Sequence, residues 1–381
     1  MKMGEQGFTM TEETESRAEG QAARLPKEML AAVYYGRNDV RMETVPVPEI
    51  GPGELLVRVH TCGVCGTDLK KISTGSHSAP RIFGHETAGV IVRTGAGVSG
   101  YKTGDRVVVF HHIPCRHCYY CGTRTFAQCE TYKKVGVTAG LEPSGGGFSE
   151  YVRVMDWIVR DGGVVPIPDA VSYEQASFLE PVSTCVKAIE GLAPKPGETV
   201  LVIGQGPIGL ILGVLAKREG ARVIASDLFP GRLTMSQSYG LTEVLDASRV
   251  NTVERIHELT EGRGADAVIL AVGGNALVRP AIDAARPGGR VMLFAQTQHS
   301  EVTIDAASVC VDEKTLLGSY SVSVDLNERT AKFVMGGAMD LARLYSHRFP
   351  LENAIAALGL AASPQPDTMK IAIQPGAKWE G

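Results

Sequence analysis

The sequence predicts an α/β protein that combines a β-rich unit with a parallel α/β unit, because its pattern changes once along the chain. From Met29 to about Val182, short apolar runs alternate with turns rich in Gly and Pro, which is typical of a compact β-rich unit. From about Val186 to Ser319, apolar strands alternate with helical runs, which is typical of a parallel sheet. A length of 381 residues leaves room for two domains.

The individual elements follow from the same patterns. In the β-rich part, strands are predicted at 30–35, 55–60, 87–92 and 105–110, with a Pro- and Gly-rich loop at 46–53. In the α/β part, the predicted strands are 199–203, 222–226, 266–270 and 289–294, and the predicted helices are 209–219, 232–239, 252–260 and 276–285. The last sixty residues add helices at 326–335 and 351–357 and a strand at 369–373.

Composition excludes several classes of partner. Hydrophobic residues make up 44% and charged residues 21%, as in ordinary globular proteins. A net charge of −4 does not favour binding to nucleic acid or to an anionic membrane. The chain shows neither an apolar signal region nor a run of transmembrane length, so we expect a cytoplasmic protein. Residues 1–28 are polar and acid-rich, and we expect them to form a disordered extension.

The stretch from Cys65 to Glu86 carries the side chains that a catalytic zinc uses. It opens with Cys65-Gly66-Thr67-Asp68 and closes with Gly84-His85-Glu86, so that a thiol, an imidazole and carboxylates fall close together. A catalytic zinc takes three protein ligands and leaves a fourth position for water or substrate. The sequence therefore predicts a catalytic metal site here, with a carboxylate as the third ligand.

A second metal site is predicted from four cysteines with the spacing C-x2-C-x2-C-x7-C, namely Cys115, Cys118, Cys121 and Cys129. Four thiolates close a tetrahedral zinc shell and leave no open position, so the role would be structural. Two alternatives are an iron–sulfur cluster and four buried free thiols. The other cysteines, Cys62, Cys185 and Cys310, are interpreted as structural thiols.

A glycine-rich turn follows the strand at 199–203 and opens a helix, with the sequence Gly204-Gln205-Gly206-Pro207-Ile208-Gly209. This G-x-G-x-x-G pattern between a strand and a helix is typical of dinucleotide binding. Gly204 permits the tight turn, Gly206 lets the backbone approach a pyrophosphate, and Gly209 lets helix and strand pack closely. Pro207 fits the first helical turn.

Asp227 ends the next strand, eighteen residues after Gly209. A carboxylate in this position accepts hydrogen bonds from a ribose and repels a 2′-phosphate, so the sequence favours NAD over NADP. Arg232 follows, and it would line the ribose or serve a phosphate. The loop Ala271–Gly274, which includes Val272, is a further candidate for contact with the cofactor.

With these motifs in this order, the chain resembles the zinc-dependent medium-chain dehydrogenases, and most of all their sorbitol (polyol) and threonine dehydrogenase branch. Besides the three sites above, the matching pieces are Gly104-Asp105-Arg106-Val107, Gly146 to Tyr151, and Glu180-Pro181. The resemblance implies a GroES-like catalytic domain at 29–184 and 320–381, which carries the four-cysteine lobe. It also implies an inserted Rossmann domain at 185–319.

The resemblance also implies roles for individual residues. Cys65 and His85 would bind the catalytic zinc together with Glu86 or Glu180, and Glu86 could instead orient the metal ligands. Thr67 would take the proton of the substrate hydroxyl, and Thr184 would contact the nicotinamide. The chain departs from the family where many relatives carry a relay histidine, since Lys70 stands there.

The function that these features predict is a zinc-dependent oxidoreductase that transfers hydride between NAD and a secondary alcohol, such as a polyol or a sugar-derived alcohol. The alternatives are a threonine or amino-alcohol dehydrogenase and a non-catalytic nucleotide-binding protein. The resemblance implies a homo-oligomer, either a dimer or a tetramer, with a small-molecule substrate. Tyr320 and Phe110 are candidates for the substrate-pocket wall.

Overall fold

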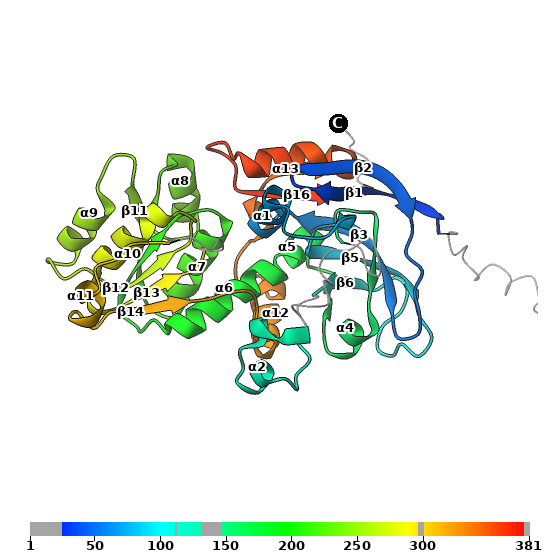
Figure 1. Cartoon of the computed structure of the whole chain (residues 1–381), viewed down its shortest axis with the longest axis horizontal. Coiled ribbons are helices and arrows are strands. Elements are labelled where there is room, and N and C mark those ends of the chain that lie inside the picture. The colour runs from blue at the N-terminus through cyan, green and yellow to red at the C-terminus, as the bar shows by residue number, and fades with distance from the viewer. Residues whose placement is uncertain (1–24, 111–112, 132–145, 296–300, 377–381) are drawn as a thin grey trace, which may run out of the picture.

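The structure is a computed structural model that describes residues 25–110, 113–131, 146–295 and 301–376. It consists of two halves, a β-rich half with two sheets and a half with one parallel sheet, that lie next to each other along the long axis of the molecule (Figure 1). Residues 1–24 of the predicted extension lie outside the described residues, and its last residue, Glu28, already begins strand β1.

The first half is β-rich and contains two sheets. The smaller sheet has the order β2-β1-β4, with strands β1 (Glu28–Gly36), β2 (Asp39–Pro46) and β4 (Arg81–Ile82). The larger sheet has the order β15-β16-β3-β5-β6-β8, with β7 paired to β3. Its strands are β3 (Leu55–Gly63), β5 (Glu86–Thr94), β6 (Arg106–Val109), β7 (Tyr151–Val154), β8 (Val164–Pro166), β15 (Tyr345–Pro350) and β16 (Lys370–Gln374).

The helices outside the parallel-sheet half are short. They are α1 (Gly66–Thr74), α2 (Tyr119–Gly122), α4 (Asp156–Arg160), α5 (Tyr173–Ser177), α12 (Asn327–Met335) and α13 (Ala354–Ala362). Five 3-10 turns complete the described chain: Phe126–Gln128, Asn275–Leu277, Val324–Leu326, Ala342–Leu344 and Leu351–Asn353.

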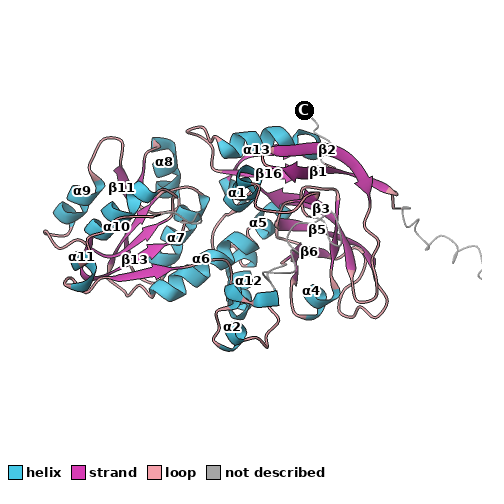
Figure 2. Ribbon diagram, viewed as in Figure 1, coloured by secondary structure: helices cyan, strands magenta, loops and turns pink. Residues whose placement is uncertain are grey.

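The second half is a six-stranded parallel sheet in the order β11-β10-β9-β12-β13-β14. The strands are β9 (Thr199–Ile203), β10 (Arg222–Asp227), β11 (Glu243–Asp246), β12 (Ala265–Leu270), β13 (Ala285–Leu293) and β14 (Thr315–Gly318). Its helices are α6 (Leu179–Leu192), α7 (Pro207–Arg218), α8 (Pro230–Ser238), α9 (Thr252–Leu259), α10 (Val278–Ala284) and α11 (Ala307–Cys310). Figure 2 shows these helices around the strands.

Apolar residues fill both faces of the parallel sheet, as expected for a sheet covered by helices on each side. Successive side chains on a strand point to opposite faces, so neighbours on β9 enter different cores. Val200 and Val202 belong to the core that includes α6 and α7, whereas Leu201 packs in the core of α9 and α10. The predicted fold class, a β-rich half with a doubly wound parallel sheet, is confirmed.

Among the helices that were not predicted, α1 and α6 carry residues of the candidate site. Helix α1 lies at 66–74, in a stretch that contains few apolar residues to mark a helical period. Helix α6 runs without a break from Leu179 to Leu192, through the point between 184 and 185 where the sequence placed the domain boundary. It packs against α7 of the parallel-sheet half.

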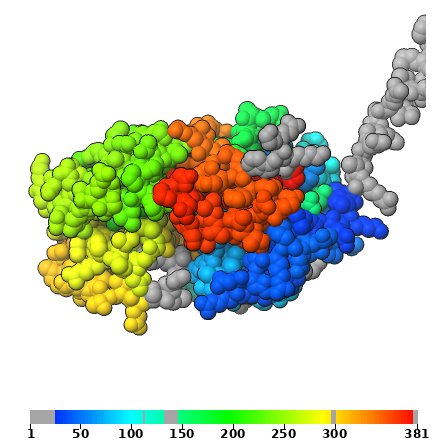
Figure 3. Space-filling view, turned by 90° about the horizontal axis from the view of Figure 1, so that it is seen from above, coloured from blue at the N-terminus to red at the C-terminus, as the bar shows by residue number. Residues whose placement is uncertain are grey.

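The C-terminal strand brings the end of the chain back to the first half. Strand β16 pairs antiparallel with β3, with Ala372 opposite Gly63. Figure 3 shows the C-terminal part of the chain, in red, against the green surface of the parallel-sheet half. Among the described residues, no helix is long and apolar enough to cross a membrane.

Glu54 joins the start of β3 to β7. Its carboxylate accepts hydrogen bonds from Arg153 Nε at 2.7 Å and Nη2 at 2.8 Å, and from the Gly51 N–H at 2.6 Å. Burial by itself raises the pKa of Glu54, but the Arg153 guanidinium and the Gly51 N–H bring this pKa below its ordinary value. The charged carboxylate therefore stabilises the fold above the ordinary glutamate pKa.

We predict that Glu54→Gln lowers the free energy of unfolding by about 1–3 kcal/mol near neutral pH, because the Arg153 guanidinium loses its charged partner. The difference from the wild type should shrink as the pH falls through the lowered pKa, where the wild-type carboxylate is protonated. Urea unfolding followed by circular dichroism at several pH values measures this. The exposed Glu49, changed to Gln, is the control. Equal stabilities of the Glu54 variant and the wild type would contradict the prediction.

Candidate active site and metal centres

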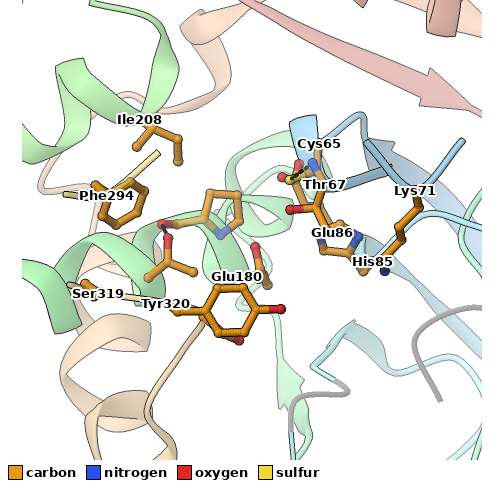
Figure 4. Close-up of a pocket in the computed structure, with 13 residues that line it drawn as sticks. Cys65, Thr67, Lys71, His85, Glu86, Glu180, Ile208, Phe294, Ser319 and Tyr320 are labelled. Atoms are coloured by element: carbon orange, nitrogen blue, oxygen red, sulfur yellow. Dashed lines mark hydrogen bonds between the residues drawn. The ribbon is translucent and has the colours of Figure 1, made fainter. Parts of the chain in front are cut away.

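A cavity of about 160 Å³ lies between the two halves of the molecule. Its walls come from α1 and β5 of the first half, from α6, and from the loops and helix α7 of the parallel-sheet half (Figure 4). The lining residues are Cys65, Thr67, Lys71, His85, Glu86, Glu180, Pro181, Thr184, Ile208, Phe294, Ser319, Tyr320 and Ser321. The sequence-predicted metal ligands and the first turn of the dinucleotide helix therefore meet in one place.

Cys65 occupies the N-cap position of α1, where the helix exposes free N–H groups. Its Sγ accepts a hydrogen bond from the Thr67 N–H at 3.4 Å. Asp68, three residues into the helix, accepts in return from the Cys65 N–H at 3.2 Å, so the two residues form a capping box. A cysteine binds metal as the thiolate.

His85 stands immediately before β5 and is buried. Its Nδ1 lies 3.1 Å from Asp68 Oδ1. Burial lowers the pKa of His85, but the charges of Asp68 and Cys65 outweigh burial and raise it well above its ordinary value. With Nδ1 held by Asp68, Nε2 is the nitrogen that would bind a metal, an arrangement common among metal-binding histidines.

Glu86 completes a group of three possible metal ligands. One ligand atom each from Cys65, His85 and Glu86 lies within 4.8 Å of the other two. The Glu86 carboxylate also accepts a hydrogen bond from Lys370 Nζ at 2.6 Å, and both residues are buried. A Cβ atom on Gly63 would lie 1.9 Å from Glu86 Oε2, so only glycine fits beneath this carboxylate.

Glu180 reaches the cavity from α6 but is not part of this group of three. It is 7% exposed, and burial raises its pKa to about 7. The two carboxylates that the sequence left as alternatives therefore differ. Glu86 is ion-paired and close to Cys65 and His85, whereas Glu180 faces them across the cavity (Figure 4).

The remaining predicted contacts divide between the cavity and the core. Thr67, Thr184, Ile208 and Tyr320 line the cavity, although the Thr184 hydroxyl donates to Pro181 O at 2.7 Å. Phe110 does not line the cavity and is 1% exposed in the core, so its prediction as a pocket wall is wrong. Its place at the end of an apolar strand made it a core residue.

The sequence missed two lysines at the site. In the sequence, Lys70 occupies the position of the relay histidine of many family members. The lysine that lines the cavity is its neighbour Lys71. Without knowledge of the helix at 66–74, the orientation of the two could not be assigned. The sequence does contain a pattern that could have identified Lys370. It is the only charged residue in the apolar run 369–373, and a charge that is buried there needs a partner of opposite charge.

The glycine-rich turn has the geometry that close packing requires. Gly204 has φ of +93°, a conformation that favours glycine. A Cβ on Gly209 would lie 1.8 Å from Gly204 O, so α7 can approach the turn only with glycine there. A Cβ on Gly206 would have no neighbour nearer than 4.0 Å, which leaves open space in front of that backbone. Pro207 is the first residue of α7.

A second cavity, of about 370 Å³, lies over the carboxyl ends of the parallel strands beside Gly204. Asp227, Arg232 and Val272 line it. Asp227 is held by two backbone groups, since Oδ2 accepts from the Gln205 N–H at 2.6 Å and Oδ1 from the Phe229 N–H at 2.9 Å.

Arg232 links this second cavity to the first half of the molecule. Its Nη1 lies 3.8 Å from Asp227 Oδ2, and its Nη2 donates to Thr368 O at 3.1 Å. The guanidinium also lies 4.9 Å from the centre of the Phe229 ring. Arg232 therefore contacts the opposite half at Thr368, which lies two residues before Lys370.

The four clustered cysteines come together around the short helix α2. The sulfurs of Cys115, Cys118, Cys121 and Cys129 all lie within 4.8 Å of one another. Burial opposes ionisation of Cys115, yet backbone N–H groups of His117 and Cys118 bring its pKa to about 6. Four sulfurs at this separation can form a closed tetrahedral site.

The other cysteines have different environments. Cys62 and Cys185 are fully buried, and burial raises their pKa values, that of Cys62 to about 12. Both are packed thiols, as predicted. Cys310 is exposed at the end of α11, so its interpretation as a structural thiol is wrong.

Two family models match the chain. Residues 51–169 match the alcohol dehydrogenase GroES-like domain, and residues 207–335 match the zinc-binding dehydrogenase family. Among curated relatives, D-arabinitol dehydrogenase 1 of Uromyces fabae is 32% identical, over 92% of this chain and 98% of the relative. Sorbitol dehydrogenase of Bacillus subtilis is 29% identical over the same shares of the two chains.

Solved structures agree with these matches. A zinc-binding dehydrogenase from Sinorhizobium meliloti, solved with NADP bound, superposes with a TM-score of 0.81 at 28% identity. The superposition covers 92% of this chain and 100% of that chain. The 2R,3R-butanediol dehydrogenase of Bacillus subtilis has a TM-score of 0.77 at 27% identity, with 91% of this chain and 100% of that chain covered. The chain thus belongs to the zinc-dependent medium-chain dehydrogenases, in the branch that contains the polyol dehydrogenases.

Proposed function

We propose that the protein is an NAD-dependent, zinc-containing dehydrogenase that oxidises a secondary alcohol of the polyol or sugar-derived class. The observation that carries this proposal is the single cavity in which Cys65, His85 and Glu86 face Ile208, in the first turn of the dinucleotide helix. The names of the relatives, which include sorbitol, D-arabinitol and butanediol dehydrogenases, support the substrate class.

Cys65, His85 and Glu86 are the proposed ligands of the catalytic zinc, because a thiolate, an imidazole and a carboxylate form a coherent donor set. We favour Glu86 over Glu180 as the third ligand, since its carboxylate lies nearer to the other two donors. The four cysteines of the α2 lobe are the proposed ligands of a structural zinc, which supplies no chemistry.

The reaction breaks the O–H and C–H bonds of a carbinol and yields a ketone, a proton and the reduced nicotinamide. A zinc ion in the site would lower the pKa of the substrate hydroxyl. We assign Thr67 to take the hydroxyl proton while it passes its own hydroxyl proton on to water, because its side chain lines the cavity beside Cys65. Asp68 keeps His85 oriented throughout, and Thr184 and Ile208 hold the nicotinamide side of the cavity.

NAD is the proposed cofactor. Gly204, Gly206 and Pro207 would form the pyrophosphate turn, while the Asp227 carboxylate and the loop at Val272 would contact the adenosine part. Arg232 already contacts Asp227 and Thr368, which supports a role beside the ribose rather than as the binding group of a 2′-phosphate.

We also propose the domain bounds, the oligomeric state and the cellular location of the enzyme. We assign the catalytic unit to residues 29–184 and 320–381 and the cofactor unit to 185–319. Two edge strands of the parallel sheet, β11 and β14, offer free edges among the described residues, so we propose a dimer or tetramer. A cluster of four reduced thiols suits the cytoplasm.

The first prediction from the proposed function tests the catalytic zinc. Cys65→Ser should lower kcat/KM by about a hundredfold or more, because the site loses its thiolate and with it the ion that activates the hydroxyl. Zinc content, measured by mass spectrometry, should fall from about two ions per chain to about one. Cys310→Ser, at an exposed position, is the control and should retain both. Unchanged zinc content and turnover in the Cys65 variant would refute the assignment.

The second prediction concerns the third ligand. Glu86→Gln should weaken zinc binding by about tenfold to a hundredfold or more, and Glu180→Gln should weaken it less. Because Glu86→Gln leaves Lys370 buried without its partner, the double variant Glu86→Gln/Lys370→Met separates loss of zinc from loss of folding. Zinc competition with a chelator, alongside thermal unfolding, measures both. A larger loss in the Glu180 variant would transfer the ligand role to Glu180.

The third prediction concerns the cofactor. Asp227→Asn should lower kcat/KM for NAD by about tenfold or more relative to NADP, because a charged acceptor for the ribose is lost and a 2′-phosphate is no longer repelled. Asparagine keeps one acceptor oxygen for the Phe229 N–H but places an NH2 group against the Gln205 N–H, so thermal unfolding of the variant is measured as well. Initial rates at 340 nm with each cofactor measure the ratio. A wild-type enzyme that already prefers NADP would overturn the assignment.

A further inference from the structure

Lys71 places a positive charge in the wall of the active-site cavity. It lies in the last turn of α1, on the same side of the cavity as Cys65 and His85 and opposite Tyr320 (Figure 4). The polyol substrates of the proposed function are neutral, so they give no reason for a lysine at this position. Lys71 therefore needs an explanation of its own.

No carboxylate pairs with Lys71 within the part of the chain that the structure describes. Its Nζ lies 5.7 Å from the centre of the Phe83 ring, near the limit of a cation–π interaction, and its charge also acts on Asp68 and His77. The carboxylates of Asp68 and Glu86, on the same side of the cavity, bind other groups, since Asp68 binds His85 and Glu86 binds Lys370. The ammonium group thus remains available to a ligand.

A lysine in the last turn of a helix also favours the helix dipole, which is the simplest structural explanation. That role does not require a position facing the cavity. Lys70 precedes it on the same helix without lining the cavity. Apolar groups such as Pro181, Ile208 and Phe294 form much of the remaining wall, and such walls strengthen the attraction of a charge for an anion.

The wall opposite Lys71 offers uncommitted hydroxyl groups. Ser319 Oγ and Ser321 Oγ are buried and have no hydrogen-bond partner among the described residues. Both residues line the cavity on either side of Tyr320. Because buried polar groups are normally hydrogen-bonded, these hydroxyls favour a ligand that carries several hydroxyl groups of its own.

We propose that the substrate is a polyhydroxylated secondary alcohol that carries an anionic group, either a carboxylate or a phosphate, which binds the Lys71 ammonium. This inference rests on the proposed function and narrows its substrate class. The anionic group would lie on the α1 side of the cavity, and the remaining hydroxyls would meet Ser319 and Ser321.

The test compares three compounds of matched carbon skeleton, namely a neutral hexitol, the corresponding hexonate and the hexitol phosphate. With the zinc-loaded full-length enzyme and NAD, kcat/KM for at least one anion should exceed that for the hexitol by about tenfold or more, because the ion pair is charge-assisted. The anion with the higher value identifies carboxylate or phosphate as the natural group. Raising the salt concentration should reduce the preference.

Variants assign the preference to Lys71. Lys71→Met should reduce the ratio of kcat/KM for the preferred anion to that for the hexitol by about tenfold, mainly through KM, since the lost interaction binds ground state and transition state alike. Lys71→Arg should keep most of the ratio. Lys70→Met is the matched control, because Lys70 is the adjacent lysine outside the cavity wall and its loss should leave the ratio unchanged.

Each other outcome is decisive. A hexitol preferred by the wild type, or a ratio that Lys71→Met does not alter, overturns this inference and leaves the proposed function intact. If none of the three compounds is oxidised, the polyol assignment of the proposed function falls. Calorimetric titration of the enzyme–NADH complex with hexonate and with hexitol phosphate then decides the role of Lys71. If neither anion binds, or if Lys71→Met leaves their binding unchanged, the inference about Lys71 is overturned.

Discussion

The active site depends on the carboxylate of Asp68, which performs two structural tasks with its two oxygens. One oxygen accepts the Cys65 N–H and closes the capping box of α1, and the other holds His85 Nδ1. A thiol from the helix start and an imidazole from the strand start are thereby fixed relative to each other. The carboxylate is completely buried, so water does not compete for either oxygen.

The end of the chain provides the second constraint. Strand β16 enters the larger sheet beside β3, which places Lys370 against Glu86, and only glycine at position 63 leaves space for the two side chains. Two residues earlier, Thr368 O accepts from Arg232 at the adenosine side of the parallel-sheet half. One short segment thus contacts both the metal site and the cofactor cavity.

Sequence reasoning predicted the fold class and the central motifs, because these depend on local patterns. Strand periodicity, the glycine triplet and the cysteine spacing each occupy a continuous stretch, and β9 and α7 appear where they were expected. Relationships between distant segments were not predictable. The pairing of Glu86 with Lys370 spans 284 residues and depends on the way in which β16 joins the sheet.

The sequence also did not predict which way individual side chains point. Lys70 and Lys71 are adjacent and chemically identical, and only the rotation of α1 decides which of them lines the cavity. Phe110 failed as a pocket residue for the same reason, since an aromatic side chain at a strand end can face the core or the cleft. A short helix with few apolar residues leaves its rotation unspecified until it is packed.

The charges around the cavity explain why a divalent cation suits the site. Asp68, Glu86 and Glu180 are all buried close to Cys65, and burial of several negative groups is costly unless each is compensated. His85 and Lys370 compensate the first two carboxylates directly. A cation bound by Cys65, His85 and Glu86 would add positive charge among these buried groups. The same balance leaves the ammonium of Lys71 outside the metal site, where a substrate rather than a protein carboxylate can meet it.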